Sequence, residues 1–234
     1  MKLTPTSTPT TTRPTQTDRH TPLFDLSQAL QIASSADSPA ALTEAMLPRI
    51  RDSFWLLVSS NSVIEAQHAQ AVSMILERAI PSGVSVALDL DWQPQRWGLP
   101  PQAPPSAEVL RRVQPLAWSA QLIRCSREEA EAFFGSADPV RVHRHDSLPQ
   151  RPAVLIRADS GALDWCIGGR QGSLEASMLQ DHDLFLTRLL DNLSSHPELL
   201  GNAGPGLDAV ADPDGMAEQL LSAALAGSAP LSDG

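Results

Sequence analysis

Apolar runs alternate with amphipathic segments along most of the chain. Residues 54–58 form an unbroken apolar run, as expected of a strand that is buried on both faces. Residues 67–80 carry apolar side chains at helical spacing, and a Pro-Ser-Gly sequence then ends the helix. Residues 84–90 are again largely apolar and predict a second buried strand. This order of strand, helix, stop and strand predicts a right-handed βαβ unit in a parallel sheet.

The same alternation extends in both directions from this unit. Upstream, Asp25 or Ser27 is placed to cap a helix that runs through residue 33. Ser38 is placed to begin another helix that reaches about residue 51. Downstream, we expect helices at 107–113, from Ser126, at 183–193 and at 216–226, strands at 120–124 and 153–156, and a hairpin strand at 163–167. The pattern predicts an α/β fold, a doubly wound and mostly parallel sheet with helices on both faces.

Composition separates a tail from the folded part. Residues 1–20 are rich in Thr and Pro, a composition that buries too little apolar area to offset the cost of ordering. We therefore expect a disordered tail at 1–20 and one α/β domain over 21–230, with a flexible break at 201–206. No run has the length of a membrane-spanning helix, and the N-terminal sequence lacks an apolar signal core.

Charge and residue usage exclude several classes of function. The formal charge of -10, with a pI near 4.9, opposes binding to nucleic acid phosphates and to anionic membranes. Lys2 is the only lysine, which excludes lysine Schiff-base chemistry and a Walker-type phosphate lysine. Cys125 and Cys166 fit neither a zinc site nor a disulfide framework, as is typical of a reduced cytoplasm. We expect a cytoplasmic protein that binds neither nucleic acid nor membrane.

Three segments occur in an order that indicates a family. The sequence DLDWQPQRW at 89–97 is similar to a D-x-N-W-R-P-x-x-W motif, and RCSREEA at 124–130 to K-x-S/N-x-E-E-A. The sequence RPAVLI at 151–156, followed by Gly161, is similar to R-P-A-V-L-V-T-x-G-x-x-G. Together the segments resemble fructokinase-like members of the PfkB-type (ribokinase-like) carbohydrate kinases, over about residues 54–193. The resemblance implies ATP and magnesium as cofactors and a small sugar such as fructose as substrate.

The resemblance also assigns site residues. Asp183 aligns with the last aspartate of D-T-T-G-A-G-D, the family's base that takes the proton from the sugar hydroxyl. The glycine-rich turn before that aspartate forms an anion hole, because developing phosphoryl charge needs convergent backbone N–H donors. The other implied contacts are Ser126, Glu129 and Gly161 to the nucleotide, Glu129 also to the metal, and Asp89, Asp91 and Trp92 to the sugar. We expect ligands at the carboxyl ends of the strands, near Asp89, Ser126, Asp159 and Asp183.

Departures from the family pattern argue against the reaction. Gln180 and His182 replace glycines of the turn, and Asp181 adds a carboxylate where repulsion opposes an anion. Arg157 and Asp159 stand where the family has Thr and Gly. The glycine-rich sugar-binding segment of the family's N-terminal portion has no counterpart in the sequence. We therefore expect a truncated form of the fold, the nucleotide half without the N-terminal lid.

Three functional hypotheses stay open. The first is an ATP-dependent sugar kinase with Asp183 as base. The second, favoured by the local chemistry, is a pseudokinase that serves as a binding or regulatory module with a protein partner or in a homodimer. In the third, a partner subunit supplies the missing lid and completes a composite site.

Simpler structural roles compete with the chemical ones. Asp183 fits the first turn of a helix, and Glu129 fits a capping box. Trp92 is expected to pack a loop onto the core more readily than to stack on a ligand. The sequence HRHD at 143–146 is expected to be a solvated loop instead of a metal cluster, because its arginine would oppose a cation. Cys125 is expected to be buried.

Overall fold

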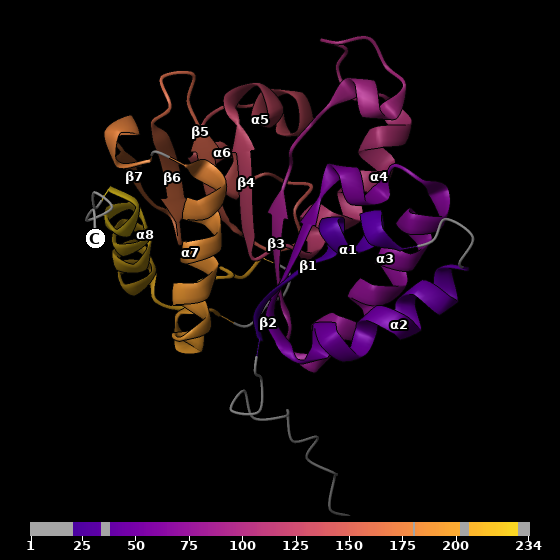
Figure 1. Ribbon diagram of the computed structural model, residues 1–234. Coiled ribbons are helices and arrows are strands. Elements are labelled where there is room, and N and C mark those ends of the chain that lie inside the picture. Colours follow the sequence, from indigo (N-terminus) through magenta and orange to yellow (C-terminus); the bar gives the residue numbers. More distant parts are fainter. Residues whose placement is uncertain (1–20, 34–37, 180, 202–205, 229–234) are drawn as a thin grey trace, which may run out of the picture.

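A single seven-stranded sheet organises the chain. The computed structural model describes residues 21–33, 38–179, 181–201 and 206–228. Its strands lie in the order β1-β2-β3-β4-β5-β6-β7, the order in which they occur in the sequence (Figure 1). The parallel strands are β1 (Thr21–Asp25), β2 (Ser53–Ser59), β3 (Ser85–Asp89), β4 (Leu122–Ser126) and β5 (Ala153–Arg157), and the antiparallel ones are β6 (Leu163–Ile167) and β7 (Arg170–Leu174). The predicted α/β class with a mostly parallel sheet is confirmed.

One face of the sheet is covered by the helices that connect the strands. Right-handed connections between strands in sequential order place their helices on the same face. These helices are α1 (Leu26–Ile32), α2 (Pro39–Arg51), α3 (Ala66–Ala79), α4 (Ala107–Ser119), α5 (Arg127–Phe134) and α6 (Pro139–His143). Their apolar side chains form one core with sheet residues such as Leu56, Leu88 and Ile123.

The opposite face is covered by the two C-terminal helices, α7 (His182–Ser194) and α8 (Pro213–Ser228). Leu186, Leu189 and Leu190 of α7 pack with Leu122 and Leu155 of the sheet in a second core. Figure 1 shows α7 and α8 across the sheet from α2, α3 and α4. The prediction of helices on both faces is therefore confirmed, and the two helical layers come from different parts of the chain.

Three short elements escaped the sequence analysis. β1 lies between the expected tail at 1–20 and the expected first helix, where no strand was predicted, and it pairs with β2 along Leu23, Phe24 and Asp25. β7 has a mostly exposed sequence with one buried residue, Leu174, so its periodicity is weak. α6 spans five residues, too few to show a helical repeat. In addition, α4 continues past the predicted end at 113 to Ser119.

The predicted solvated loop at 143–146 is wrong for His143. His143 ends α6, is 2% exposed, and has its Nδ1 atom 2.8 Å from the carbonyl oxygen of Pro152. Its Nε2 atom lies 3.3 Å from a carboxylate oxygen of Asp208. A buried ring with two polar partners explains the residue, and among the described residues no group of three metal-ligating side chains gathers anywhere.

Some expectations concern segments that the structure does not describe. The tail at 1–20 and most of the break at 201–206 lie outside the described residues. Within the described part, every strand joins the one sheet, so these residues form no separate lid sheet. The same part contains no helix with both the length and the apolar character needed to cross a bilayer.

The packing of α7 can be tested by two leucine truncations in that helix. Leu189 is fully buried, so Leu189→Ala removes packed methyl groups and is expected to lower the free energy of unfolding by about 3 kcal/mol. Leu184 is 43% exposed, and Leu184→Ala is expected to cost less than about 1 kcal/mol. Urea denaturation followed by circular dichroism measures both, and equal losses would contradict the placement of α7.

Candidate functional site

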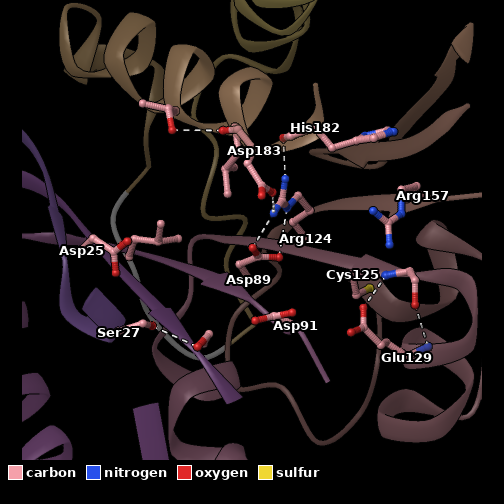
Figure 2. A pocket seen from close by; sticks show the side chains of 15 residues that line it. Asp25, Ser27, Asp89, Asp91, Arg124, Cys125, Glu129, Arg157, His182 and Asp183 are labelled. Carbon is pink, nitrogen blue, oxygen red and sulfur yellow. Dashed lines mark hydrogen bonds and ion pairs between the residues drawn. The ribbon is translucent and has the colours of Figure 1, made fainter. Parts of the chain in front are cut away.

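A cavity of about 400 Å³ lies at the carboxyl ends of the parallel strands, beside the start of α7 (Figure 2). Ligands of parallel α/β sheets usually bind at this edge. Of the residues predicted for the site, the cavity brings together Asp89, Asp91, Ser126, Glu129 and Asp183. The charged or titratable side chains that line it are Asp25, Asp89, Asp91, Arg124, Glu129, Arg157, His182 and Asp183, with Cys125 beside them.

The register of the strands decides which side chains face the cavity. Asp89 of β3 pairs with Arg124 of β4, and Ser126 of β4 pairs with Arg157 of β5. Side chains alternate between the faces of a strand, so Arg124, Ser126 and their partners point to the same face. Leu122, two residues before Arg124 on β4, points to the same face and packs against the leucines of α7. The sheet therefore ends in a polar row directly beside the start of α7.

Arg124 joins two strands to α7. Its Nε atom donates to Asp89 Oδ1 at 2.9 Å, and its Nη2 atom donates to the other oxygen of Asp89. The same Nη2 atom donates to Asp183 Oδ1 at 2.7 Å, while Nη1 donates to the carbonyl oxygen of His182. The side chains of Arg124 and Asp89 are 12% and 20% exposed, whereas that of Asp183 is 89% exposed. The guanidinium thus makes one shielded and one exposed ion pair.

The charge of Arg124 is stabilised by these partners. Burial disfavours the guanidinium cation, but the hydrogen bonds and attraction to Asp89, and then to Asp183, outweigh burial and raise the pKa of Arg124 above its ordinary value. The pKa of His182 is lowered by burial and then by the nearby Arg157 and Arg124 guanidinium groups, which outweigh Asp183 and Asp181. The imidazole of His182 is therefore neutral at neutral pH.

The start of α7 is capped by its own chain. Asp181 accepts hydrogen bonds at one carboxylate oxygen from the N–H groups of Asp183, at 3.0 Å, and Leu184, at 2.9 Å. The hydrogen bond from Leu184, followed by that from Asp183 and against the opposing effect of burial, lowers the pKa of the Asp181 carboxyl. These N–H groups are the donors that a helix N-terminus offers to a phosphoryl group. In this chain an ionised side chain occupies them.

Both carboxylate oxygens of Glu129 are used within the fold. One accepts from the N–H of Ser126 at 2.6 Å, while the Ser126 hydroxyl accepts from the N–H of Glu129 at 3.2 Å. This is the predicted capping box at the start of α5. The other oxygen accepts from the N–H of Trp92. Glu129 therefore fastens the loop after β3 to the start of α5.

The loop after β3 turns its two predicted sugar contacts in different directions. Asp91 lines the cavity, and its carboxylate accepts hydrogen bonds from the side-chain amides of Asn61 at 2.7 Å and Gln93 at 2.9 Å. Trp92 does not line the cavity. Its ring packs edge-on against Phe133, with 5.6 Å between centroids, and joins the core. The expected packing role of Trp92 is confirmed.

Two predicted positions lie outside the cavity. Gly161 and Asp159 belong to the turn between β5 and β6, and neither lines the cavity. Gly161 has φ 84°, a left-handed conformation that suits glycine, and its N–H donates to the carbonyl oxygen of Ala158 at 2.9 Å.

Cys125 is buried as predicted, and burial, followed by Glu129 and Asp89, raises the pKa of its thiol. A neutral, buried thiol is unreactive.

Among the cavity residues that were not assigned to the site from the sequence, Asp25, Arg124 and Arg157 carry formal charges. Each one ends a strand or stands two residues before its end. A charged side chain at the carboxyl end of an apolar run was the available signal, because such positions share one edge of a parallel sheet.

The two carboxylates on Arg124 are expected to differ in their contribution to stability. Asp89→Asn removes the shielded pair and leaves a largely buried guanidinium with one exposed partner, at an expected cost of about 2 to 3 kcal/mol. Asp183→Asn removes the exposed pair and is expected to cost less than about 1 kcal/mol. Chemical denaturation of both variants tests this order. A larger loss for Asp183→Asn would show that the exposed ion pair between Arg124 and Asp183 holds α7 in place.

Comparisons with known proteins address the fold as a whole. No protein-family profile matches the sequence, and no match is found among curated proteins. Solved structures do match. The fructokinase from Xylella fastidiosa with bound ATP has a TM-score of 0.60 and 18% identity, with 86% of this chain and 62% of that chain covered. The PfkB protein from Polaromonas sp. JS666 has a TM-score of 0.56 and 17% identity, with coverages of 84% and 60%.

A third match is the aminoimidazole riboside kinase from Salmonella enterica complexed with aminoimidazole riboside and an ATP analogue, with a TM-score of 0.53 and 16% identity. It covers 76% of this chain and 56% of that chain. The chain therefore spans roughly three fifths of the length of these kinases. These matches agree with the resemblance seen in the sequence. The chain has the PfkB-type, ribokinase-like carbohydrate kinase fold.

Proposed function

We propose that the chain is a pseudokinase, a PfkB-type fold that serves as a binding or regulatory module and transfers no phosphoryl group. The observation that carries this proposal is the Asp181 carboxylate on the N–H groups of Asp183 and Leu184. A phosphoryl group in transit needs those donors free, because they stabilise the charge that develops on its oxygens. The Asp181 carboxylate already accepts from both N–H groups, so they are not free for a phosphoryl group, and its negative charge repels one.

The base position is also compromised. Asp183 has the helix position expected of the base, but its carboxylate accepts a hydrogen bond from Arg124 at 2.7 Å. A guanidinium at this distance occupies one of the two carboxylate oxygens, so a substrate hydroxyl has to compete with Arg124 for that oxygen. The same guanidinium is already bound to Asp89 in a bidentate pair, so it is held beside Asp183.

ATP and magnesium, the cofactors that the resemblance implies, do not fit the residues present. Glu129, the implied magnesium-linked residue, has both carboxylate oxygens on backbone N–H groups. Within the described residues no cluster of three candidate ligands forms. The wall of the cavity formed by β1, β3 and the loop after β3 carries Asp25, Asp89 and Asp91, which repel a triphosphate.

An active sugar kinase is the alternative, and one observation favours it. The Asp183 side chain is 89% exposed and lines the cavity, so a substrate hydroxyl has access to it. The Xylella and Vibrio cholerae fructokinases were solved with ATP and with fructose, ADP and calcium, respectively. In this alternative a partner protein or a second copy of the chain covers the cavity, since the described residues form no separate lid sheet.

The proposal predicts that phosphotransfer is absent. Calorimetry is expected to show no binding of ATP with magnesium up to millimolar concentration, since Asp181 fills the anion site. An ATP-consumption assay against a panel of sugars that includes fructose is expected to stay at background, both for the natural chain and for Asp183→Ala. Asp191→Ala, an exposed aspartate of the same helix, is the control for effects of charge on the assay. Turnover that disappears in Asp183→Ala and persists in Asp191→Ala would refute the proposal.

A further inference from the structure

The cavity is electrically divided along the sheet. Asp25 of β1, Asp89 of β3 and Asp91 after β3 lie on one side, and Arg124 of β4 and Arg157 of β5 lie on the other. Two carboxylates accompany the arginines: Asp183, which pairs with Arg124, and Glu129, whose two oxygens accept from backbone N–H groups. Figure 2 shows this arrangement, with Asp25 and Arg157 at opposite sides and Arg124 between them. A cavity whose walls carry opposite charges selects a ligand with two chemically different ends.

The side of the cavity that carries Arg124 and Arg157, here called the basic wall, contains a cation without an observed partner in the described part of the chain. Among the described residues, none forms a hydrogen bond or an ion pair with the guanidinium of Arg157, which is exposed and lines the cavity. Arg124 beside it is paired, but one of its two carboxylate partners is the exposed Asp183. An exposed pair is worth little, so an incoming anion can compete for that side of Arg124.

His182 reports the local potential at this wall. Its pKa is lowered first by burial and then by Arg157 and Arg124, and the nearby Asp183 and Asp181 do not cancel the effect of the two guanidinium groups. The guanidinium groups of Arg157 and Arg124 therefore lie close enough to act on His182, although the chain has a formal charge of -10. An anion is therefore attracted at this wall of the cavity, while the net charge of the chain repels anions elsewhere.

The opposite wall offers acceptors and hydroxyl groups. Asp25 uses one carboxylate oxygen to cap α1, by accepting from the N–H of Gln28 at 2.9 Å. Ser27 has its hydroxyl 2.9 Å from that of Ser59 and 2.7 Å from that of Ser62. Hydroxyl groups of a ligand can donate to the second oxygen of Asp25 and exchange hydrogen bonds with Ser27.

We propose that the cavity binds a small hydroxylated anion, a compound of sugar size that carries one carboxylate or phosphate group. The anionic group pairs with Arg157 and with the side of Arg124 that Asp183 occupies. Asp183 then acts as an internal substitute for the ligand anion and is displaced by it. The hydroxyl groups face Asp25, Ser27 and Asp91, and a volume of about 400 Å³ suits a molecule of this size. This inference rests on the proposed function, because it assigns Asp183 to anion exchange instead of proton transfer.

Calorimetry on the full chain at low ionic strength tests the proposal with four probes. Gluconate supplies a carboxylate, glucose 6-phosphate supplies a phosphate, glucose supplies the hydroxyl groups alone, and inorganic phosphate supplies the anion alone. At least one of the two hydroxylated anions is expected to bind, and more tightly than both glucose and inorganic phosphate. The tighter of the two identifies the anionic group.

Three variants separate the roles of the charges. Arg157→Gln is expected to weaken binding about tenfold or more, because it removes a charge-assisted hydrogen bond. Arg141→Gln makes the same change at an exposed residue of α6, outside the cavity, and is expected to bind as the natural chain does. Asp183→Asn is expected to tighten binding roughly two- to fivefold, because it removes a competing charge of an exposed pair. Circular dichroism establishes that each variant is folded.

The outcomes distinguish this inference from the proposed function. No binding of either hydroxylated anion, equal binding of glucose, or equal affinities of Arg157→Gln and Arg141→Gln would overturn the inference while leaving the pseudokinase proposal intact. Weaker binding by Asp183→Asn would overturn the role of Asp183 as a competitor. Phosphotransfer that depends on Asp183 would instead refute the proposed function.

Discussion

The guanidinium of Arg124 connects the sheet to the start of α7. It is the group at which β3, β4 and the start of α7 meet, through Asp89, Asp183 and the carbonyl oxygen of His182. A side chain that is 12% exposed needs its charge compensated, and within the described residues the carboxylates of Asp89 and Asp183 form its ion pairs. Arg124 therefore connects the start of α7, which the leucines of the second core pack onto the sheet, to the ends of β3 and β4 at the edge of the cavity.

Under the proposed function, the interactions that stabilise the fold at this edge are the ones that oppose phosphoryl transfer. An N-terminal helix cap and an ion pair to the helix both favour α7 as it stands. A kinase site needs the same N–H groups and the same carboxylate kept free for substrate. In this structure Asp181 binds the N–H groups and Arg124 binds the carboxylate of Asp183. The same atoms thus serve the stability of α7 and are not free for catalysis.

The sequence predicted the regular part of the fold because long, strongly periodic segments such as α3 and α7 carry their own signal. It missed β1 because that strand exists through pairing with β2, about 30 residues later, and has no periodicity of its own. It predicted Asp89, Asp91, Glu129 and Asp183 at one cavity through motif order. It predicted the capping box of Glu129, but it could not show the hydrogen bonds of Glu129 with the N–H of Trp92 and of Asp183 with Arg124, since these join segments far apart in the sequence.

The basic wall of the cavity follows from the same substitutions that weaken the kinase interpretation. Arg157 stands at the end of β5, where the register with Ser126 turns its side chain to the cavity face. A cation at that place has no partner in the described chain, and its repulsion contributes to the neutral state of His182. A residue retained only for packing would not need a charge exposed to the cavity. The replacement of a threonine by Arg157 therefore fits a change of ligand, from a nucleotide that wraps around backbone donors to a small anion held by side chains.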